Sequence, residues 1–368
     1  MNKFSNVILI GAWPPPSGGV ASYTQDLYYN LLNKGINVKV YAKGDFQIKD
    51  KNINHINLSL KHPFKTFLSL LKIFREIPFK AIVHTQSFLT ARPNIFLCIY
   101  FLIFKQLKHI YLVETLHDGT LPDRYNSFTN YQRLLYSFID KILDKLIVTN
   151  ETLNKFCANI GISSSKIVTI NSFLPINYIK VNDNNISSEY QKFIERFPFT
   201  VSTVGAFIPD YDLKTIVEAF LLFSQKYPKS GLIILETAFI ENTEYRNRVL
   251  KNIEGVSNIL IFKNLPRDKF FGILSRTKLF IRGCINDSFG LSKVEAILMG
   301  ANVITAKTGT MKFMTLYEYQ NTDSLFSAML KTILNINKKT QDGETYYRQL
   351  AYNNLDRILN IYNIPIDK

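Results

Sequence analysis

Short apolar runs alternate with longer amphipathic stretches through the first half of the chain. Most of these runs are almost continuously apolar, which is typical of strands buried on both faces. They predict strands at Asn6–Gly11, Asn37–Ala42, Ala81–Gln86, His109–Leu116, Lys145–Asn150 and Lys166–Asn171. The stretches between them predict helices, with Pro93 as a first helical residue and Gly35 as a C-cap, at Val20–Lys34, Pro63–Arg75, Pro93–Lys108, Tyr131–Leu143 and Glu151–Ile160. This alternation predicts a parallel sheet covered by helices on both faces.

The alternation stops once and then resumes. Residues Ile179–Gln191 are polar, rich in Asn and Ser and without a clear period, so we expect a hinge there. Beyond it, the pattern predicts strands at Phe199–Gly205, Gly231–Glu236, Asn258–Phe262, Leu279–Arg282 and Asn302–Ala306. It predicts helices at Asp212–Lys226, Thr243–Asn252, Arg267–Ser275, Gly290–Met299, Thr322–Leu334 and, in the tail, Glu344–Ile361. We therefore expect two Rossmann-like domains at residues 1–178 and 199–343, a linker at 179–198 and a C-terminal helix at 344–368.

Length and composition agree with this organisation. A chain of 368 residues is too long for one ordinary core, and 46% hydrophobic with 20% charged residues is a globular composition. The N-terminal apolar run is short and leads into Gly11 and Pro14, unlike a signal peptide. The most apolar stretch, Ile95–Phe104, is far below the roughly 20 residues that span a bilayer. No zinc pattern or disulfide framework is visible, so we expect a cytoplasmic protein with reduced thiols at Cys98, Cys157 and Cys284.

The formal net charge of +15 is unevenly distributed. Residues 1–180 hold 21 Lys and Arg against 10 Asp and Glu, whereas the remaining residues hold 23 against 19. A basic first half indicates an anionic partner, such as nucleic acid, an acidic membrane surface or a phosphorylated lipid. A chain that is generally rich in Lys and Asn is the alternative interpretation. Because no helix-turn-helix, RNA-binding or zinc-finger motif is present, we expect no nucleic-acid partner.

Two strand-to-helix junctions of the first half carry candidate chemistry, because ligands of open parallel sheets bind at the carboxyl ends of strands. Gly18 and Gly19 let a ligand approach the backbone where a helix begins, although a plain Pro/Gly turn is the alternative. His117 and Asp118 leave a buried strand and can polarise a substrate oxygen or bind a sugar hydroxyl, or else form a capped loop. His84 ends the preceding strand on the same side. We interpret it as a packing or supporting residue and group it with Asp118 on the acceptor side.

The third junction, from Arg282 to Gly300, is the most specific. A strand ends, a short loop follows, and a helix begins near Gly290. Glu295 lies one turn into this helix, where a carboxylate can accept two ribose hydroxyls, and Asp287 precedes the helix within reach of a sugar. An N-capping Asp and a solvated Glu are the alternative. Backbone amides here, with the helix dipole, would face a diphosphate, so we expect the donor-binding residues to be Gly205, Arg282, Ser288, Phe289, Gly290, Leu291 and Glu295, together with Gly18 and Gly19.

This junction resembles the retaining glycosyltransferases of family 4. Their Glu-x7-Glu segment reads roughly Glu-Gly-Phe-Gly-Leu, then Glu-Ala, then Gly-x-Pro-Val-Ile, and it corresponds here to the segment Asp287-Ser-Phe-Gly-Leu-Ser-Lys-Val-Glu295-Ala-Ile-Leu-Met-Gly-Ala-Asn-Val-Ile304. Gly18-Gly19 is similar to the family's N-terminal glycine loop, and His117 stands where the family has a His that contacts the donor sugar or its phosphate. Because the resemblance follows most of the chain in order, it implies the GT-B fold: two Rossmann-like domains with parallel sheets facing a central cleft, and a C-terminal helix packing back toward the N-terminal domain.

The sequence departs from the family at the diphosphate. The family places an Arg directly after the glycine at Gly205 and a Lys five residues beyond it, whereas this chain has Ala206 and Tyr211. The first Glu of the motif is also replaced by the shorter Asp287. Charge-assisted hydrogen bonds contribute about 1.5–3 kcal/mol each, so we expect another cation to substitute, with candidates Lys214, Arg282 and Lys293.

The resemblance implies transfer of a sugar, of hexosyl or N-acetylhexosaminyl type, from a UDP- or GDP-sugar to a saccharide or lipid-linked saccharide. It also implies retention of configuration, no metal, no further cofactor, and a role in bacterial-type surface polysaccharide synthesis. His117, Asp287 and Glu295 are the expected catalytic residues, and we expect Glu295→Ala to remove most turnover while leaving the fold intact. A non-catalytic GT-B subunit that supports an active partner is the alternative.

The helix predicted from Pro63 also suits a membrane surface. Its cations Lys61, Lys65, Lys72, Arg75 and Lys80 are interleaved with Phe64, Phe67, Leu68, Leu71 and Phe74. We expect peripheral contact with anionic lipid at the inner face of the cell membrane. One apolar face packed on the sheet, with the lysines in solvent, is the alternative.

Overall fold

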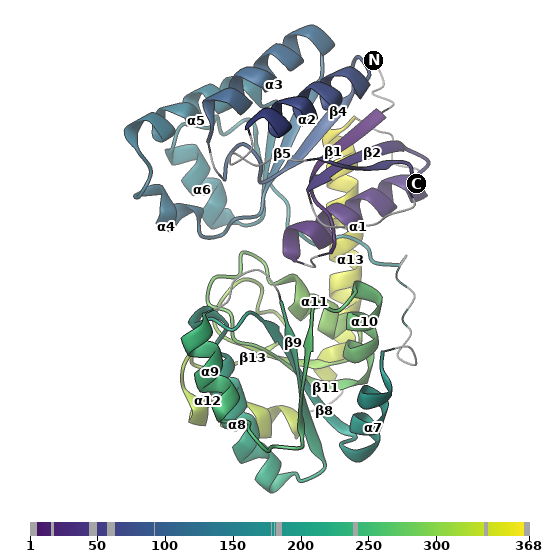
Figure 1. Cartoon of the computed structure of the whole chain (residues 1–368), viewed down its shortest axis with the longest axis vertical. Coiled ribbons are helices and arrows are strands. Elements are labelled where there is room, and N and C mark those ends of the chain that lie inside the picture. Colours follow the sequence, from purple (N-terminus) through teal and green to yellow (C-terminus); the bar gives the residue numbers. More distant parts are fainter. Residues whose placement is uncertain are drawn as a thin grey trace. The chain divides into compact units, whose positions relative to one another are not determined.

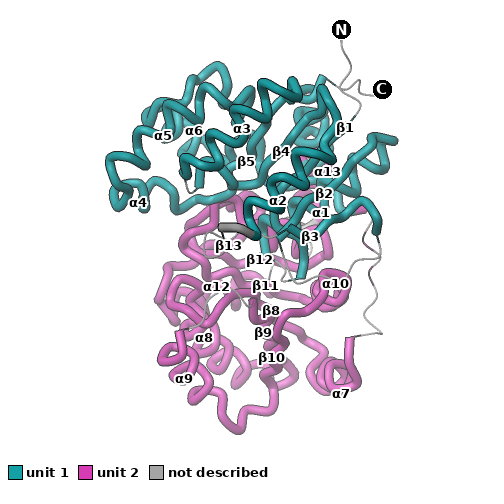
Figure 2. The backbone as a smooth tube through the Cα atoms, turned by 45° about the horizontal axis from the view of Figure 1, so that its top comes forward, with its two compact units in different colours: residues 1–176, 351–368 teal, residues 177–350 magenta. Residues whose placement is uncertain are grey.

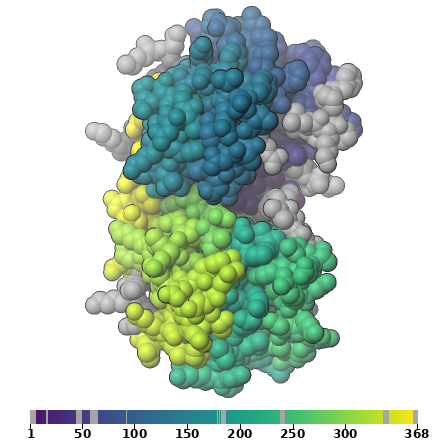
Figure 3. Space-filling view, turned by 90° about the vertical axis from the view of Figure 1, so that its left-hand side faces the viewer, coloured from purple at the N-terminus to yellow at the C-terminus, as the bar shows by residue number. Residues whose placement is uncertain are grey.

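The computed structural model of the chain consists of two compact units, formed by Met1–Ile176 with Ala351–Lys368 and by Asn177–Leu350 (Figures 1 and 2). The structure describes residues 6–15, 18–43, 50–56, 63–91, 93–177, 179, 181, 186–237, 242–334 and 338–363. Each unit is built on one parallel sheet with helices packed against it, and Figure 3 shows one face of the molecule with its atoms space-filled. The predicted α/β class, with two Rossmann-like parallel sheets, is confirmed.

The sheet of unit 1 has seven strands in the order β3-β2-β1-β4-β5-β6-β7. Every pairing is parallel; Val7, for example, lies opposite Val38 on one side and Ile82 on the other. The edge strand β3, with only three residues, was not predicted. The strands are β1 (Asn6–Ala12), β2 (Asn37–Lys43), β3 (Ile53–His55), β4 (Ile82–Gln86), β5 (Tyr111–Leu116), β6 (Lys145–Val148) and β7 (Ile167–Thr169).

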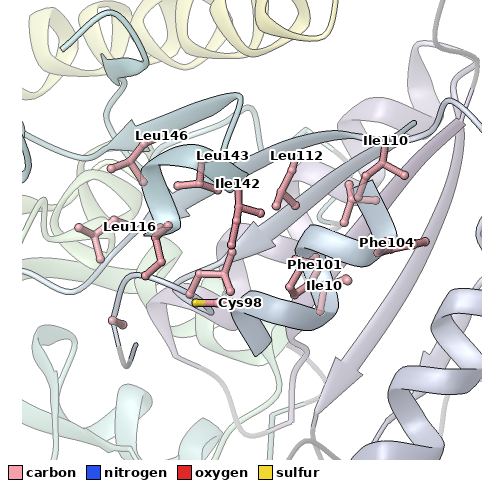
Figure 4. Packing of buried hydrophobic residues seen from close by; sticks show 14 of the residues in the cluster. Ile10, Cys98, Phe101, Phe104, Ile110, Leu112, Leu116, Ile142, Leu143 and Leu146 are labelled. Atoms are coloured by element: carbon pink, nitrogen blue, oxygen red, sulfur yellow. The ribbon is translucent and has the colours of Figure 1, made fainter. Parts of the chain in front are cut away.

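Helices of unit 1 cover its sheet on both faces. They are α1 (Gly19–Asn33), α2 (Pro63–Glu76), α3 (Ile95–Lys108), α4 (Leu121–Tyr125), α5 (Asn130–Ile142) and α6 (Glu151–Asn159), joined by the last part of α13 (Lys338–Ile361). One apolar core lies beneath α2, α3 and α5, where Phe101 and Phe104 meet Leu112 (Figure 4). The other core places Leu27 of α1 with Ile358 and Tyr362 from the C-terminal segment.

Two helix ends of unit 1 refine the expectations. Pro93 is not a first helical residue, because α3 begins at Ile95 and the side chain of Asn94 caps it by accepting from the amides of Phe96 and Leu97. Asn94 supplies an oxygen that proline lacks, so it defines the start. Lys34 is the C-cap of α1, and Gly35 follows it with a φ of +70°.

Unit 2 repeats the design with six parallel strands in the order β10-β9-β8-β11-β12-β13. The strands are β8 (Phe199–Gly205), β9 (Ser230–Glu236), β10 (Ile259–Lys263), β11 (Thr277–Arg282), β12 (Asn302–Thr305) and β13 (Thr315–Leu316). The helices are α7 (Ser188–Arg196), the 3-10 turn η1 (Pro209–Tyr211), α8 (Leu213–Lys226), α9 (Thr243–Lys251), α10 (Arg267–Arg276), α11 (Leu291–Leu298), α12 (Thr322–Ile333) and the first part of α13.

The region expected to be a linker contains helix α7. Ser187 caps its first turn by accepting from the amide of Tyr190. Tyr190 and Phe193 then bury their rings in a cluster that includes Ile233 and Leu235 of β9. This helix was not predicted, because the polar, Asn- and Ser-rich residues before it dominate the local composition.

Both sheets reverse their strand order at one point. In unit 1 the reversal falls between β1 and β4, and in unit 2 it falls between β8 and β11. Loops leave in opposite directions at such a point, so their carboxyl ends form the natural ligand site of each sheet. Within the part of the chain that the structure describes, no helix is long and apolar enough to cross a bilayer.

Candidate functional site

Predicted donor residues of unit 2 gather at the reversal point of its sheet. β8 ends at Gly205 and the neighbouring β11 ends at Arg282, and Thr203 lies opposite Ile281 in their ladder. The loop after β11 contains Asp287 and leads into α11. The predicted loop thus lies at the sheet edge where open α/β sheets bind ligands.

Arg282 and Asp287 form an ion pair with two parallel hydrogen bonds. Arg282 Nε and Nη2 donate to the two carboxylate oxygens of Asp287 at 2.9 and 2.7 Å, and the side chains are 11% and 10% exposed. Burial alone would favour the neutral acid, but the Arg282 guanidinium and the Lys293 ammonium together hold the pKa of Asp287 below its usual value. Asp287 is therefore a fixed carboxylate, and the N-cap of α11 is Gly290 instead of Asp287.

Arg282 also lies over the end of β8, beside the position of the missing cation. Its Nη1 donates to the carbonyl oxygen of Val204 at 2.7 Å, one strand away. The ring of Tyr211 packs against the guanidinium with 4.9 Å between the guanidinium carbon and the ring centroid. A Cβ on Gly205 would stand only 2.5 Å from this ring, so the glycine makes room for Tyr211. Tyr211 thereby supports an arginine from another strand.

The loop enters α11 through Gly290, which adopts a φ of +83° as the N-cap residue. This glycine brings no side chain to the first amides of α11, and Lys293 occupies the space that a Cβ would fill. The Lys293 ammonium is buried and donates to the carbonyl oxygen of Thr308 at 2.6 Å. Burial lowers the pKa of Lys293 to about 8, while Asp287 at 3.9 Å favours the charged form.

Glu295 lies inside the unit instead of in solvent. Arg267, at the start of α10, donates to its Oε1 at 2.6 Å, and the two side chains are 8% and 5% exposed for Arg267 and Glu295. Arg267 was not identified from the sequence, because 28 residues separate it from Glu295 and no local pattern connects them. Both motif carboxylates are thus held by arginines in this structure.

The three remaining residues of the donor loop differ in exposure. Phe289 is buried, and its carbonyl oxygen accepts from the amide of Thr310 at 2.8 Å. Ser288 and Leu291 are half-buried on either side of it. The loop is therefore fixed from within by Phe289.

In unit 1, His117 follows β5 and contacts residues of two neighbouring segments. Its Nε2 donates to the Oε1 of Gln86 at 2.8 Å, which leaves Nδ1 to accept from the hydroxyl of Ser172 at 3.3 Å. Its backbone amide donates to the Oγ of Ser87, and its ring meets that of Tyr23 edge-on at 4.6 Å. Desolvation lowers the pKa of His117 well below its usual value, so the imidazole is neutral at pH 7.

The carboxylate of Asp118 forms hydrogen bonds and an ion pair within the turn that leads into α4. Its Oδ1 accepts from the amide and the hydroxyl of Thr120 at 3.0 and 2.6 Å, and its Oδ2 forms an ion pair with Arg124 of α4. This is the capped loop that was the alternative interpretation. In this structure the carboxylate of Asp118 organises the start of α4.

His84 lies in the core beneath the sheet edge. It is fully buried, and its ring nitrogens contact the hydroxyl of Tyr362 and, at 2.7 Å, that of Thr115. The structure therefore places His84 as a packing residue that holds the C-terminal segment. It does not bring the His84 ring to a surface where an acceptor could touch it.

Gly18 and Gly19 stand at the start of α1. Gly18 is the N-cap in an extended conformation, and its carbonyl oxygen accepts from the amide of Ser22 at 2.8 Å. A Cβ on Gly19 would meet nothing within 4 Å, so the backbone there is open to approach. Gly18 and Gly19 belong to unit 1, whereas the Asp287 loop belongs to unit 2.

Metal-ligating side chains do not converge anywhere among the described residues: no group of three or more His, Cys, Asp or Glu could hold an ion. The three cysteines are buried and free.

Comparisons with known proteins bear on the fold. No protein-family model and no curated protein matches the chain. Among solved structures, HepE of Anabaena in complex with UDP and glucose is 14% identical with a TM-score of 0.73, over 98% of this chain and 99% of that chain. Sucrose-phosphate synthase from Thermosynechococcus elongatus is 12% identical with a TM-score of 0.73, over 98% of each chain. A glycosyltransferase from Rickettsia africae is 19% identical with a TM-score of 0.67, over 99% of this chain and 98% of that chain. The chain therefore has the GT-B fold that these glycosyltransferases share.

Proposed function

We propose that this protein transfers a sugar from a nucleotide sugar to a saccharide or lipid-linked saccharide, with the nucleotide bound by unit 2. The observation that carries this proposal is the Arg282–Asp287 pair at the reversal point of the sheet, directly ahead of the start of α11. Structures with the same fold include HepE in complexes with UDP and with UDP-glucose. A uridine or guanosine diphosphate sugar is the donor class that we infer.

Arg282 is the best candidate for the missing diphosphate cation. Its guanidinium lies at the carboxyl ends of β8 and β11, where it donates to Asp287 and to the carbonyl oxygen of Val204. Lys214, in contrast, is 58% exposed on α8 and lies 3.7 Å from Glu218. Lys293 is buried below the loop with its ammonium on Thr308. Arg282 is therefore favoured over Lys214 and Lys293 by its position at the reversal point of the sheet.

In this proposal the diphosphate lies against the first amides of α11, Asp287 orients the sugar, and Glu295 accepts ribose hydroxyls. Neutral His117 would donate to, or accept from, the sugar or phosphate by exchanging its Gln86 contact. The family resemblance supplies the remaining chemistry: the acceptor hydroxyl attacks from the face that the nucleotide leaves, and the leaving diphosphate takes its proton. Such a site accelerates transfer by positioning the reactants and stabilising charge, with retention and without a metal.

The acceptor and the setting extend the same proposal. We infer a hexosyl- or N-acetylhexosaminyltransferase of surface polysaccharide synthesis that acts in the cytoplasm at the inner face of the membrane. The basic first half of the chain supports an anionic surface nearby.

A non-catalytic subunit is the second candidate. It is favoured because arginines hold both motif carboxylates, and because Ala206 and Tyr211 stand in place of two expected cations. Such a subunit would bind nucleotide weakly or not at all and would not turn over.

Calorimetric titration with UDP and GDP, followed by donor hydrolysis with a panel of nucleotide sugars, separates the two candidates. We expect binding of one nucleotide and slow hydrolysis of one donor class. Glu295→Gln should weaken nucleotide binding, whereas Glu254→Gln, an exposed acid of the same unit, should not. No turnover on the full panel, with weak or absent nucleotide binding, would refute the transferase and favour the subunit.

A further inference from the structure

Helix α3 is apolar on all sides, yet only one side is covered. Cys98, Phe101 and Phe104 point into the core. The opposite side presents four apolar residues at helical spacing, from 43% exposed to 75% exposed: Phe96, Ile99, Ile103 and Leu107. A helix that is apolar all round is normally buried all round, so the bare side of α3 calls for an apolar environment.

Helix α2 packs beside α3 and also carries exposed apolar side chains. The hydroxyl of Tyr100 on α3 donates to the carbonyl oxygen of Leu70 at 2.8 Å, and the ring centroids of Phe74 and Phe104 lie 5.4 Å apart, so the two helices pack side by side. Of the 18 exposed large apolar side chains among the described residues, eight belong to α2, α3 and the turn after α2: Phe67, Leu68, Leu71 and Phe79 in addition to the four of α3. We call these eight residues the α2–α3 surface.

Cations accompany the α2–α3 surface. Residues 63–109 contain seven Lys and Arg and a single acidic residue, Glu76. Glu76 is engaged by Lys39 and by the hydroxyl of Tyr41 on β2. The exposed cations on and after α2 are Lys65, Lys72, Arg75 and Lys80, whereas Lys61 and the side chain of Phe64 lie outside the described residues. The α2–α3 surface thus combines exposed apolar side chains with exposed cations of α2.

We propose that the α2–α3 surface binds an anionic lipid bilayer, with the bare side of α3 lying in the interface and the cations of α2 on the headgroups. The charge favours a bilayer over a second copy of the chain as the binding partner. A second copy would bring its own cations against those of α2, whereas an anionic bilayer neutralises them. This assigns the membrane contact to α3, which was not expected, with α2 supplying charge. It rests on exposure and charge alone and is independent of the transferase chemistry.

Co-sedimentation with vesicles tests the surface without any donor or acceptor. The probes are vesicles of phosphatidylcholine and vesicles of equal parts phosphatidylcholine and phosphatidylglycerol. We expect binding to the anionic vesicles, and a loss of roughly 100-fold in the double variant Phe96→Ser/Ile103→Ser, because two large apolar side chains no longer enter the interface. The matched control Leu222→Ser/Leu334→Ser removes two exposed leucines of unit 2 and should bind normally.

Two variants that remove positive charges test whether the cations of α2 contribute to binding of the anionic bilayer. Lys72→Gln/Arg75→Gln should weaken binding by about 30-fold, and added salt should weaken the wild type similarly. Lys229→Gln/Lys278→Gln, two exposed lysines of unit 2, should leave binding unchanged. Circular dichroism checks that each variant is folded.

Three results would overturn the proposal: no binding to anionic vesicles, equal binding by the Phe96→Ser/Ile103→Ser variant, or a concentration-dependent dimer in light scattering that this variant abolishes. The last would assign the surface to a second copy. Donor hydrolysis measured on the same variants separates failure of this surface from failure of the proposed transferase.

Discussion

The ion pair between Arg267 and Glu295 makes a quantitative prediction. Arg267 Nη2 and Glu295 Oε1 are 2.6 Å apart, and less than a tenth of either side chain is exposed. Removing one partner of a buried ion pair costs about 3–5 kcal/mol, because the other charge stays buried. Glu295→Ala should therefore lower the free energy of unfolding by about that amount. This replaces the expectation from sequence that the alanine variant leaves the fold intact.

Glu295→Gln separates charge from shape. Its side-chain carbonyl oxygen can still accept from Arg267, so the loss should be smaller than in Glu295→Ala, although the buried Arg267 charge is no longer neutralised. The glutamine variant is for this reason the better probe of nucleotide binding. Nucleotide affinity should fall in both variants, but the alanine variant should lose more stability than the glutamine variant.

Urea unfolding followed by circular dichroism measures these changes. The only tryptophan, Trp13, is buried in unit 1, so its fluorescence reports the unit that does not contain Glu295. Glu254→Ala, at an exposed position of unit 2, should stay within about 0.5 kcal/mol of the wild type. If Glu295→Ala unfolded at the wild-type urea midpoint with an unchanged slope, the ion pair would contribute nothing and the reasoning would be refuted.

Three further outcomes follow from the same contacts. Gly205→Ala should destabilise unit 2 by about 1–3 kcal/mol in urea unfolding, because its methyl group would stand 2.5 Å from the Tyr211 ring. Arg282 keeps the folded-state pKa of Asp287 below its unfolded value, so this carboxylate stabilises the fold above about pH 4 and the gain is lost as the pH falls through the folded pKa. Asp287→Asn should be less stable at pH 7 and show a shallower loss in acid; an acid slope equal to that of the wild type would contradict this. Burial lowers the pKa of His84 to about 3, so stability should fall as the pH drops below about 6.5, and NMR should detect no titration of its ring between pH 6 and 8.

Most strands of this fold were predictable, because a strand that is buried on both faces has a continuous run of apolar residues. β8 was predicted from Phe199 to Gly205 and has those bounds. The short edge strands β3 and β13 were not predicted, because segments of three and two residues are too short to show a hydrophobic pattern. Helix α7 was not predicted, because its buried residues Tyr190 and Phe193 follow a polar stretch that dominates the local composition.

The candidate site was predictable only where it is local in sequence. The positions of Asp287 and Gly290 just before α11 were predictable, because a single strand-loop-helix segment contains them both. The partners of its charges do not: Arg267 reaches Glu295 from α10, and the Tyr211 ring that supports Arg282 comes from η1, after β8. Such contacts depend on which strands lie side by side, and no single-segment pattern encodes that order.

Division of the first unit between the two ends of the chain has a consequence for biosynthesis. Unit 2 is one continuous segment, Asn177–Leu350, whereas the core of unit 1 includes Leu355, Ile358 and Tyr362. A ribosome therefore finishes every residue of unit 2 before it makes the last pieces of unit 1. The half that emerges first must wait, with part of its apolar interior uncovered, until translation has passed Tyr362. A premature stop shortly before that residue would damage the oldest part of the nascent chain and spare the newer one.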